Sequence, residues 1–154
     1  MMSKKRYIKP DAVKELEYLA TEAAREKHPT LPNYALAPRK FRDDKANDLT
    51  KCIIEYIKIK HGFATRLNST GIYRQDIKKF VPNTQRKGMP DVFGLFNGLT
   101  LFIEVKIGYD KMSLDQVKVK NEAENNGAKY FIAKNFTDFK IWIDNILENE
   151  KSEH

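Results

Sequence analysis

The chain has 154 residues, the length of one domain, and carries 28 Lys and Arg against 21 Asp and Glu, a formal net charge of +7. A basic balance suits a polyanionic partner, and a lone cysteine, Cys52, excludes an internal disulfide and a cysteine-based zinc cluster. No apolar run approaches the roughly 18 residues of a membrane span, and no apolar signal region follows the basic start. We therefore expect a cytoplasmic protein that does not bind membranes.

The N-terminal third predicts one helix and an extended linker. Residues 11–27 show apolar side chains at helical spacing, and Pro10 and Asp11 suit a helix start. Residues 28–42 hold three prolines and no periodicity. We accordingly divide this single-domain protein into an N-terminal helix and Pro-rich linker, residues 1–42, and a main domain, residues 43–154.

The main domain is expected to begin near Asp43, and its first helix is expected to end near His61-Gly62. A short strand over 63–68 follows, and residues 69–90 form a polar loop or a partly strand-like excursion. Cys52 is expected to be buried on the helix. The helix is predicted by an apolar stripe at positions i, i+3, i+4, i+7 and i+8, formed by Leu49, Cys52, Ile53, Tyr56 and Ile57.

The second half predicts a hairpin, a helix, a strand and a final helix. Strands over 91–96 and 99–107 flank Asn97-Gly98, a strong hairpin turn. Ser113 and Gln116 form a capping box for the next helix, which ends at Gly127, and residues 129–133 form a strand that a right-handed crossover places parallel to its predecessor. Thr137 is expected to cap the last helix. Its apolar side comprises Phe139, Trp142, Ile143 and Ile146.

The chemistry concentrates in residues 88–106, GMPDVFGLFNGLTLFIEVK. Asp91 starts the first apolar strand, and Glu104 and Lys106 share one face of the second while Val105 points the other way. Unpaired charge on an apolar hairpin is costly to bury. A divalent metal between Asp91 and Glu104, with Lys106 beside it, would account for the pattern. The alternative is an ion network on an exposed sheet.

This constellation resembles the PD-(D/E)XK nuclease superfamily, and more narrowly its small phage-type VRR nuclease branch. The similarity covers roughly residues 46–143, about two thirds of the chain. It implies a restriction-endonuclease-like α/β fold, an αβββαβ core with a mixed central sheet flanked by helices, to which this chain adds helices at both ends. The residues that carry it are Gly88, Pro90, Asp91, Glu104, Val105, Lys106, Ser113, Gln116, Gly127 and Phe131.

The resemblance implies a site for Mg²⁺ or Mn²⁺ on the carboxylates of Asp91 and Glu104 and the carbonyl of Val105. It makes Lys106 the cation that orients the attacking water, and it places Gln116 facing the site as a further catalytic residue. The capping box alone would also explain Gln116. Relatives often carry a glutamate near the start of the first helix, where this chain has only Asn47 and Asp48 as nearby polar candidates.

The implied activity is a metal-dependent endonuclease that cuts DNA, with branched or flapped DNA as the expected substrate and a bacterial or phage-infected cell as the setting. RNA stays open as a partner, and a homodimer is expected. The alternative is a nucleic-acid-binding module with little or no cleavage. Residues 71–90 hold five cations against one anion and lead directly into Asp91. The expected DNA contacts are Asn47, Arg66, Arg74, Arg86 and Lys87.

Overall fold

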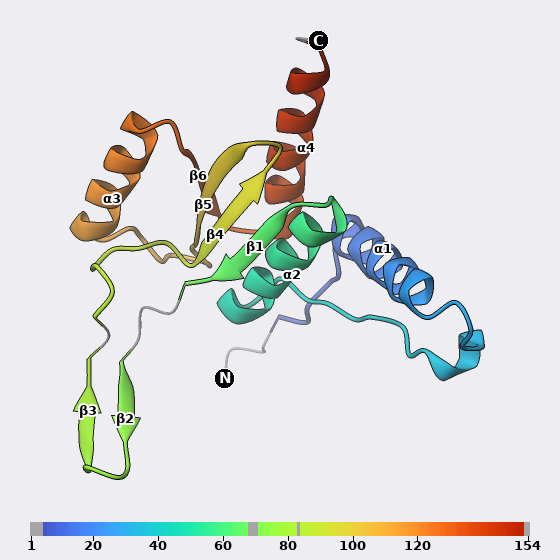
Figure 1. Ribbon diagram of the computed structural model, residues 1–154, viewed down its shortest axis with the longest axis horizontal. Helices are drawn as coiled ribbons and strands as arrows, with labels where there is room; N and C mark the ends of the chain where they lie inside the picture. The colour runs from blue at the N-terminus through green and yellow to red at the C-terminus, as the bar shows by residue number, and fades with distance from the viewer. Residues whose placement is uncertain (1–4, 68–70, 83, 153–154) are drawn as a thin grey trace.

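The computed structural model describes residues 5–67, 71–82 and 84–152. The elements of the central sheet follow the expected αβββαβ order, with two further strands inserted after its first strand and one helix added at each end (Figure 1). The helices are α1 (Asp11–Lys27), α2 (Ala46–Ile59), α3 (Leu114–Asn125) and α4 (Phe136–Ser152), and a 3-10 turn spans Asn33–Ala35. The strands are β1 (Phe63–Arg66), β2 (Ile72–Arg74), β3 (Lys79–Val81), β4 (Val92–Phe96), β5 (Leu99–Val105) and β6 (Lys129–Ala133).

The central sheet is mixed, as the sequence predicted. Its strand order is β1-β4-β5-β6; β1, β4 and β5 run antiparallel, and β6 runs parallel to β5. Asn97 and Gly98 both have positive φ, 48° and 76°, as a two-residue hairpin turn of the primed type requires. The β5–α3–β6 connection brings the C-terminal ends of β5 and β6 to one edge of the sheet.

The two faces of the sheet differ in chemistry because side chains alternate along β5. Leu101, Ile103 and Val105 are buried in one hydrophobic cluster with α1, α2 and α4. The intervening Phe102 and Glu104 point to the opposite face, where Phe102 contacts the Tyr130 ring at 6.5 Å between centroids. Lys120 of α3 lies over that ring, so α3 covers this second face (Figure 1).

The N-terminal segment is part of the core rather than an appendage. Val13 and Leu16 of α1 are fully buried in the main cluster. Buried Asp43 accepts hydrogen bonds from the Tyr7 hydroxyl at 2.9 Å and from the Phe136 backbone N–H at 3.0 Å. One carboxylate therefore joins the N-terminal segment to the start of α4.

Residues 69–90 were expected to form a polar loop or a partly strand-like excursion, and their described part matches the second alternative. Within the described part of this segment, β2 and β3 pair with each other and form a separate two-stranded sheet that projects from the body (Figure 1). Tyr73 and Phe80 are opposite each other on this hairpin and are both more than half exposed. The alternating burial that marks a strand from sequence is absent, because every residue of β2 and β3 is exposed.

Several predicted boundaries also need correction. The strand expected over 63–68 ends at Arg66, and Asn68 lies outside the described residues. Strand β5 ends at Val105, although the Lys106 N–H still donates to Ala133 O at 2.9 Å. Thr137 does not cap the last helix. Asn135 does so, because its side-chain oxygen accepts from the Asp138 N–H at 2.8 Å.

Other features are as predicted: Cys52 is fully buried on α2, and Ser113 and Gln116 form both hydrogen bonds of the capping box. Across the part of the chain that the structure describes, no helix is both long enough and apolar enough to span a bilayer.

We expect Leu16→Ala to lower the free energy of unfolding by about 2–5 kcal/mol, the usual cost of emptying a fully buried leucine site. Because α1 shares the main hydrophobic cluster, urea unfolding followed by circular dichroism should keep a single transition. Tyr18→Ala, on the exposed side of the same helix, is the matched control and should change stability little. A separate early transition for α1 in the Leu16 variant would show that the N-terminal segment folds independently.

Candidate active site

Asp91 lies at the start of β4, directly beside Glu104 of β5. The register pairs Val92 with Ile103, so Asp91 comes next to Glu104 at the end of the antiparallel ladder. Beyond this pair, the hydrogen bonding between the strands continues through the Asp91 side chain. Its Oδ2 accepts a hydrogen bond from the Val105 N–H at 2.8 Å. The Asp91 carbonyl accepts from the Leu67 N–H at 2.8 Å. The aspartate is therefore fixed to both neighbouring strands.

Glu104 is buried, with 3% of its surface exposed. Its Oε1 is contacted by Lys106 Nζ at 3.2 Å and accepts a hydrogen bond from Gln116 Nε2 at 2.7 Å. Its Oε2 is buried and has no hydrogen-bond partner within the described ranges. Burial raises the pKa of Glu104 to about 7; the charge of Asp91 acts in the same direction, and Lys106 opposes it.

Lys106 is 7% exposed and lies between two carboxylates. Its Nζ is 3.2 Å from Glu104 Oε1 and 3.5 Å from Asp110 Oδ2. Asp110 was not among the residues predicted from the sequence. The only available signal was an acidic residue four positions after Lys106, which is a weak one outside a helix. The two carboxylates therefore hold the Lys106 amine in place at the site and offset its positive charge.

Gln116 combines the two roles that the sequence left as alternatives. Its backbone N–H and its Oε1 complete the capping box with Ser113, while its Nε2 donates to Glu104. Because the capping box fixes the side chain, the amide points at the carboxylate without further ordering. Gln116 therefore links α3 to β5 across the site.

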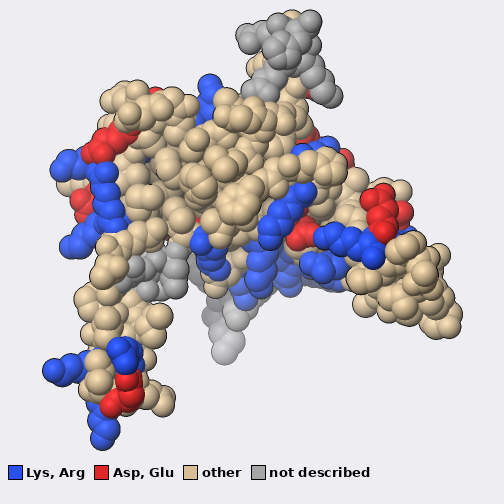
Figure 2. Space-filling view, viewed as in Figure 1, with Lys and Arg blue, Asp and Glu red and all other residues tan. Residues whose placement is uncertain are grey.

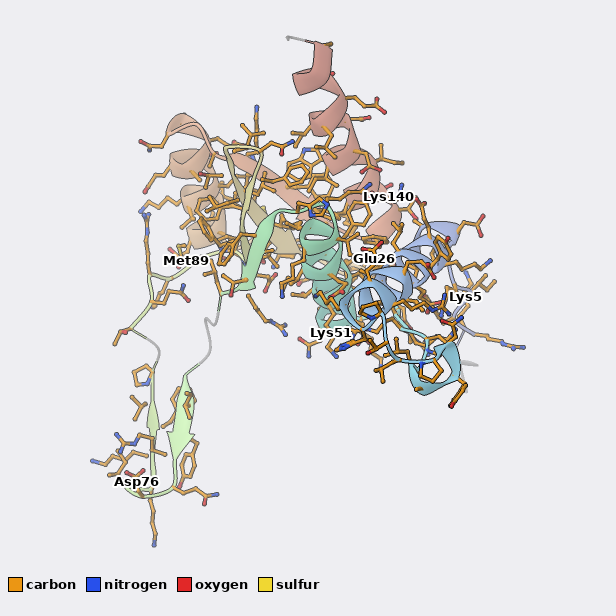
Figure 3. All side chains as sticks on the ribbon, turned by 45° about the vertical axis from the view of Figure 1, so that its right-hand side comes forward. Lys5, Glu26, Lys51, Asp76, Met89 and Lys140 are labelled. Carbon is orange, nitrogen blue, oxygen red and sulfur yellow. The ribbon has the colours of Figure 1, made fainter. Side chains whose placement is uncertain are left out.

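Gly88 brings the segment before Asp91 against the start of α3. Its φ is +80°, and a Cβ built on it would lie 2.4 Å from the Asp115 carbonyl carbon and oxygen. Only glycine permits both this backbone conformation and this approach. Met89 and buried Pro90 then lead into Asp91, and Figure 3 labels Met89 where the segment meets the sheet.

Two of the five expected DNA contacts lie beside the site. Arg66 pairs with Val92 in the sheet register, one position from Asp91, and its guanidinium donates to Asn47 Oδ1 at the start of α2. Asp48, the other polar candidate on α2, lies 3.8 Å from Lys51. In the described structure, neither Asn47 nor Asp48 contacts Asp91 or Glu104 through a hydrogen bond or ion pair.

The other three expected DNA contacts are placed differently. Arg74 lies on the projecting hairpin and pairs with Asp76, so it is apart from the carboxylates. Arg86 makes a two-point ion pair with Glu122 at 2.7 and 2.8 Å, which ties its segment to α3. Lys87 is exposed on that same segment. Binding of DNA by these residues stays a prediction.

The residues present fit a hard divalent cation. Over the described residues, no group of three or more His, Cys, Asp and Glu side chains is placed to hold a metal. Asp91 and Glu104 nevertheless offer two carboxylates, one with an unpartnered oxygen, next to the Val105 backbone. Mg²⁺ commonly takes one or two carboxylates and completes its shell with water and substrate phosphate. Asp91, Glu104 and the Val105 carbonyl are therefore the residues that would hold it.

We expect Gly88→Ala to destabilise the protein by more than the 1–2 kcal/mol typical of a side chain in the left-handed region. The added cost comes from the contact with the Asp115 backbone, which forces α3 and Gln116 away from Glu104. Gly127→Ala is the matched control, because Gly127 has φ +87° and nothing within 4 Å of the built Cβ. Equal losses in urea unfolding would show that the approach of Gly88 to α3 is not tight.

In EDTA, the free energy of unfolding of the wild type should fall between pH 5 and pH 8 through Glu104. Its pKa of about 7 in the folded protein exceeds the ordinary 4.5. The folded protein therefore holds more protons than the unfolded chain in this window, and the stability present below pH 4.5 is lost as pH rises through 7. The difference is at most about 3 kcal/mol.

Glu104→Gln should flatten this fall in urea titrations at each pH. Glu122→Gln is the control, because the ion pair with Arg86 lowers the pKa of Glu122 and places its effect below pH 4.5. An unchanged slope in the Glu104 variant would contradict a raised pKa at that residue.

The comparison with known proteins confirms the expected fold. A solved structure described as a VRR_NUC domain matches 64% of this chain and 94% of its own, with a TM-score of 0.50 and 20% sequence identity. No family model matches the sequence, and no curated protein matches it. At this identity the likeness concerns the fold. The chain therefore has the mixed α/β fold of a VRR_NUC domain.

Proposed function

We propose that the protein is a metal-dependent nuclease that hydrolyses phosphodiester bonds in DNA. The observation that carries the proposal is the buried Glu104 carboxylate, which leaves Oε2 unpartnered beside Asp91 and Lys106. A structural ion pair would be expected to satisfy both oxygens, because an unsatisfied buried carboxylate oxygen costs free energy. A metal site that acts on a phosphate needs a carboxylate oxygen of this kind, which is free to bind the cation.

Each residue would contribute a distinct part of the reaction. A bound Mg²⁺ or Mn²⁺ would supply polarisation of the phosphate and activation of the attacking water. Lys106 Nζ would donate to that water and offset the charge that develops on the phosphate. Gln116 holds Glu104 in position through Oε1, which leaves Oε2 directed to the ligand. In-line attack by water breaks the bond to the 3′ oxygen, and the products carry a 3′ hydroxyl and a 5′ phosphate.

The proposed substrate is branched or flapped DNA, with sequence playing little part. Arg66 and Asn47 lie at the rim of the site and would contact the sugar–phosphate backbone, which carries no direct sequence information. The projecting β2–β3 hairpin adds exposed Tyr73 and Phe80, aromatic rings of the kind that stack on unpaired bases. The backbone contacts would make binding independent of sequence, and the exposed rings favour DNA with single-stranded or branched parts.

One observation favours the second function, a nucleic-acid-binding module without cleavage. The start of α2 supplies no acidic group to the site, because Asn47 binds Arg66 and Asp48 pairs with Lys51. The site therefore has two carboxylates where a third would strengthen metal binding. Metal-dependent cleavage distinguishes the two functions directly.

With Mg²⁺ or Mn²⁺, we expect the protein to cut DNA, and EDTA should abolish the cutting. Asp91→Asn, Glu104→Gln and Lys106→Met should each lower the rate by at least about 100-fold, since removal of one preorganised charged group at a reacting centre costs about that much. The assay compares supercoiled, linear, single-stranded, flapped and four-way-junction DNA at equal protein concentration.

Glu148→Gln, which removes an exposed carboxylate near the end of α4, is the matched acidic control and should keep the wild-type rate. Circular dichroism and thermal unfolding must show that each variant is folded. Binding of DNA without cleavage under every metal would instead establish the binding module.

A further inference from the structure

A basic cavity of about 670 Å³ lies where the N-terminal segment crosses the first half of α2. Five of its eight lining residues are cationic and one is acidic, in a region that the sequence suggested was only a linker and a helix. Figure 2 shows Lys and Arg side chains gathered along this lower edge of the molecule, and Figure 3 labels Lys51 there. The lining residues are Tyr7, Lys9, Arg39, Lys40, Phe41, Arg42, Asp48 and Lys51.

Three of these cations are available to a ligand. The side chains of Arg39, Lys40 and Lys51 are 52%, 73% and 70% exposed, and their nearest carboxylates are at 4.0, 3.9 and 3.8 Å. Exposed ion pairs at such distances are weak and salt-sensitive. By contrast, Arg42 makes a two-point contact with Asp44 at 2.7 and 2.9 Å. The first three side chains can therefore turn to an anion at little cost.

The cavity is built on a fixed frame. Buried Glu17 of α1 accepts from the Phe41 N–H at 2.9 Å, and Thr21 Oγ1 accepts from the Arg39 N–H at 3.0 Å. Buried side chains of α1 thus hold the backbone that carries Arg39 and Lys40. The positions of the cations are set before any ligand arrives, which reduces the ordering that binding requires.

The first turns of α2 link the cavity to the candidate active site, because the helix carries Lys51 at the cavity and Asn47 next to Arg66. Lys51 lies one turn after Asn47, on the same side of the helix. Asn47 binds Arg66, and Arg66 is paired with Val92, the residue after Asp91. A polyanion bound at the carboxylates could extend past Arg66 and Asn47. It would then meet Lys51, followed by Arg39 and Lys40.

We propose that this cavity binds the phosphodiester backbone of the DNA that flanks the cleaved bond. The inference rests on the proposed nuclease function and extends its substrate contact. A row of separated cations suits a polymer of regularly spaced phosphates. The two aromatic rings of the cavity are not open to stacking with bases. The Arg42 guanidinium lies 4.4 Å from the Tyr7 ring centroid, and Phe41 is partly buried against the core. The cavity therefore binds phosphates without stacking on bases, and it adds affinity but no sequence preference.

The test measures binding of a labelled 30-base-pair duplex in EDTA, where no cleavage occurs, between 50 and 200 mM salt. The triple variant Arg39→Gln/Lys40→Gln/Lys51→Gln should bind at least about 10-fold more weakly at 100 mM salt. Its plot of log affinity against log salt should be less steep by about 2 to 3, since each lost phosphate contact removes about 0.9. Lys51→Gln alone should lower the slope by about 1.

The matched control, Lys58→Gln/Lys118→Gln/Lys129→Gln, removes the same charge from exposed lysines at the far end of α2, on α3 and at the start of β6. It should change affinity by less than about 3-fold. Equal losses in the two triple variants, wild-type binding by the cavity variant, or no binding by the wild type would overturn the proposal. So would displacement of the duplex by poly-glutamate at the same charge concentration, because it would indicate a general anion site.

The result is separable from the nuclease proposal. If the cavity variant binds weakly while no metal supports cleavage by the wild type, the cavity is a DNA-backbone site and the nuclease proposal fails. If the wild type cleaves and the cavity variant binds normally, the reverse holds. Where both stand, the cavity variant should raise KM for cleavage and leave kcat close to the wild-type value.

Discussion

The site depends on one costly feature, a buried carboxylate in which only one of the two oxygens has hydrogen-bond partners. Glu104 Oε1 receives both Lys106 and Gln116, while Oε2 receives no hydrogen bond from the described residues. Burial raises the pKa of Glu104 to about 7. Such a group persists only if packing elsewhere compensates for it. The fully buried side chains that β5 contributes to the opposite face supply that compensation.

The contacts around Glu104 join three segments that are distant in the sequence: the start of α3, the segment that ends at Asp91, and β5. Gln116 reaches Glu104 because a capping box fixes it at the start of α3, and Gly88 allows the segment before Asp91 to touch that helix end. Asp91 in turn binds the Val105 N–H. The charged groups therefore rest on strand ends and on a helix cap, which are rigid elements that hold reacting groups better than mobile loops do.

Local chemistry predicted most of the fold, and the features it missed lie on exposed strands and loops. Short apolar runs located β4 and β5, and Asn97-Gly98 and Ser113-x-x-Gln116 marked a turn and a helix start, because each signal depends on neighbouring residues alone. The β2–β3 hairpin has no buried face and so gave no alternation. The pairing of Arg86 with Glu122 and the contact of Lys106 with Asp110 depend on loop paths that the sequence does not encode locally.

The first turn of α2 carries Asn47 in place of an acidic residue, and the basic cavity lies beside that turn. One electrostatic explanation accounts for both features. Where the resemblance predicted an acidic group, Asn47 binds Arg66, and the next turn of α2 presents Lys51 to the cavity. The N-terminal end of a helix also carries positive partial charge. On the nuclease proposal, this end of α2 would attract phosphate instead of adding a metal ligand. Two carboxylates remain at the centre with cations around them, so a bound divalent ion would be held jointly by the protein and by a phosphate of the substrate.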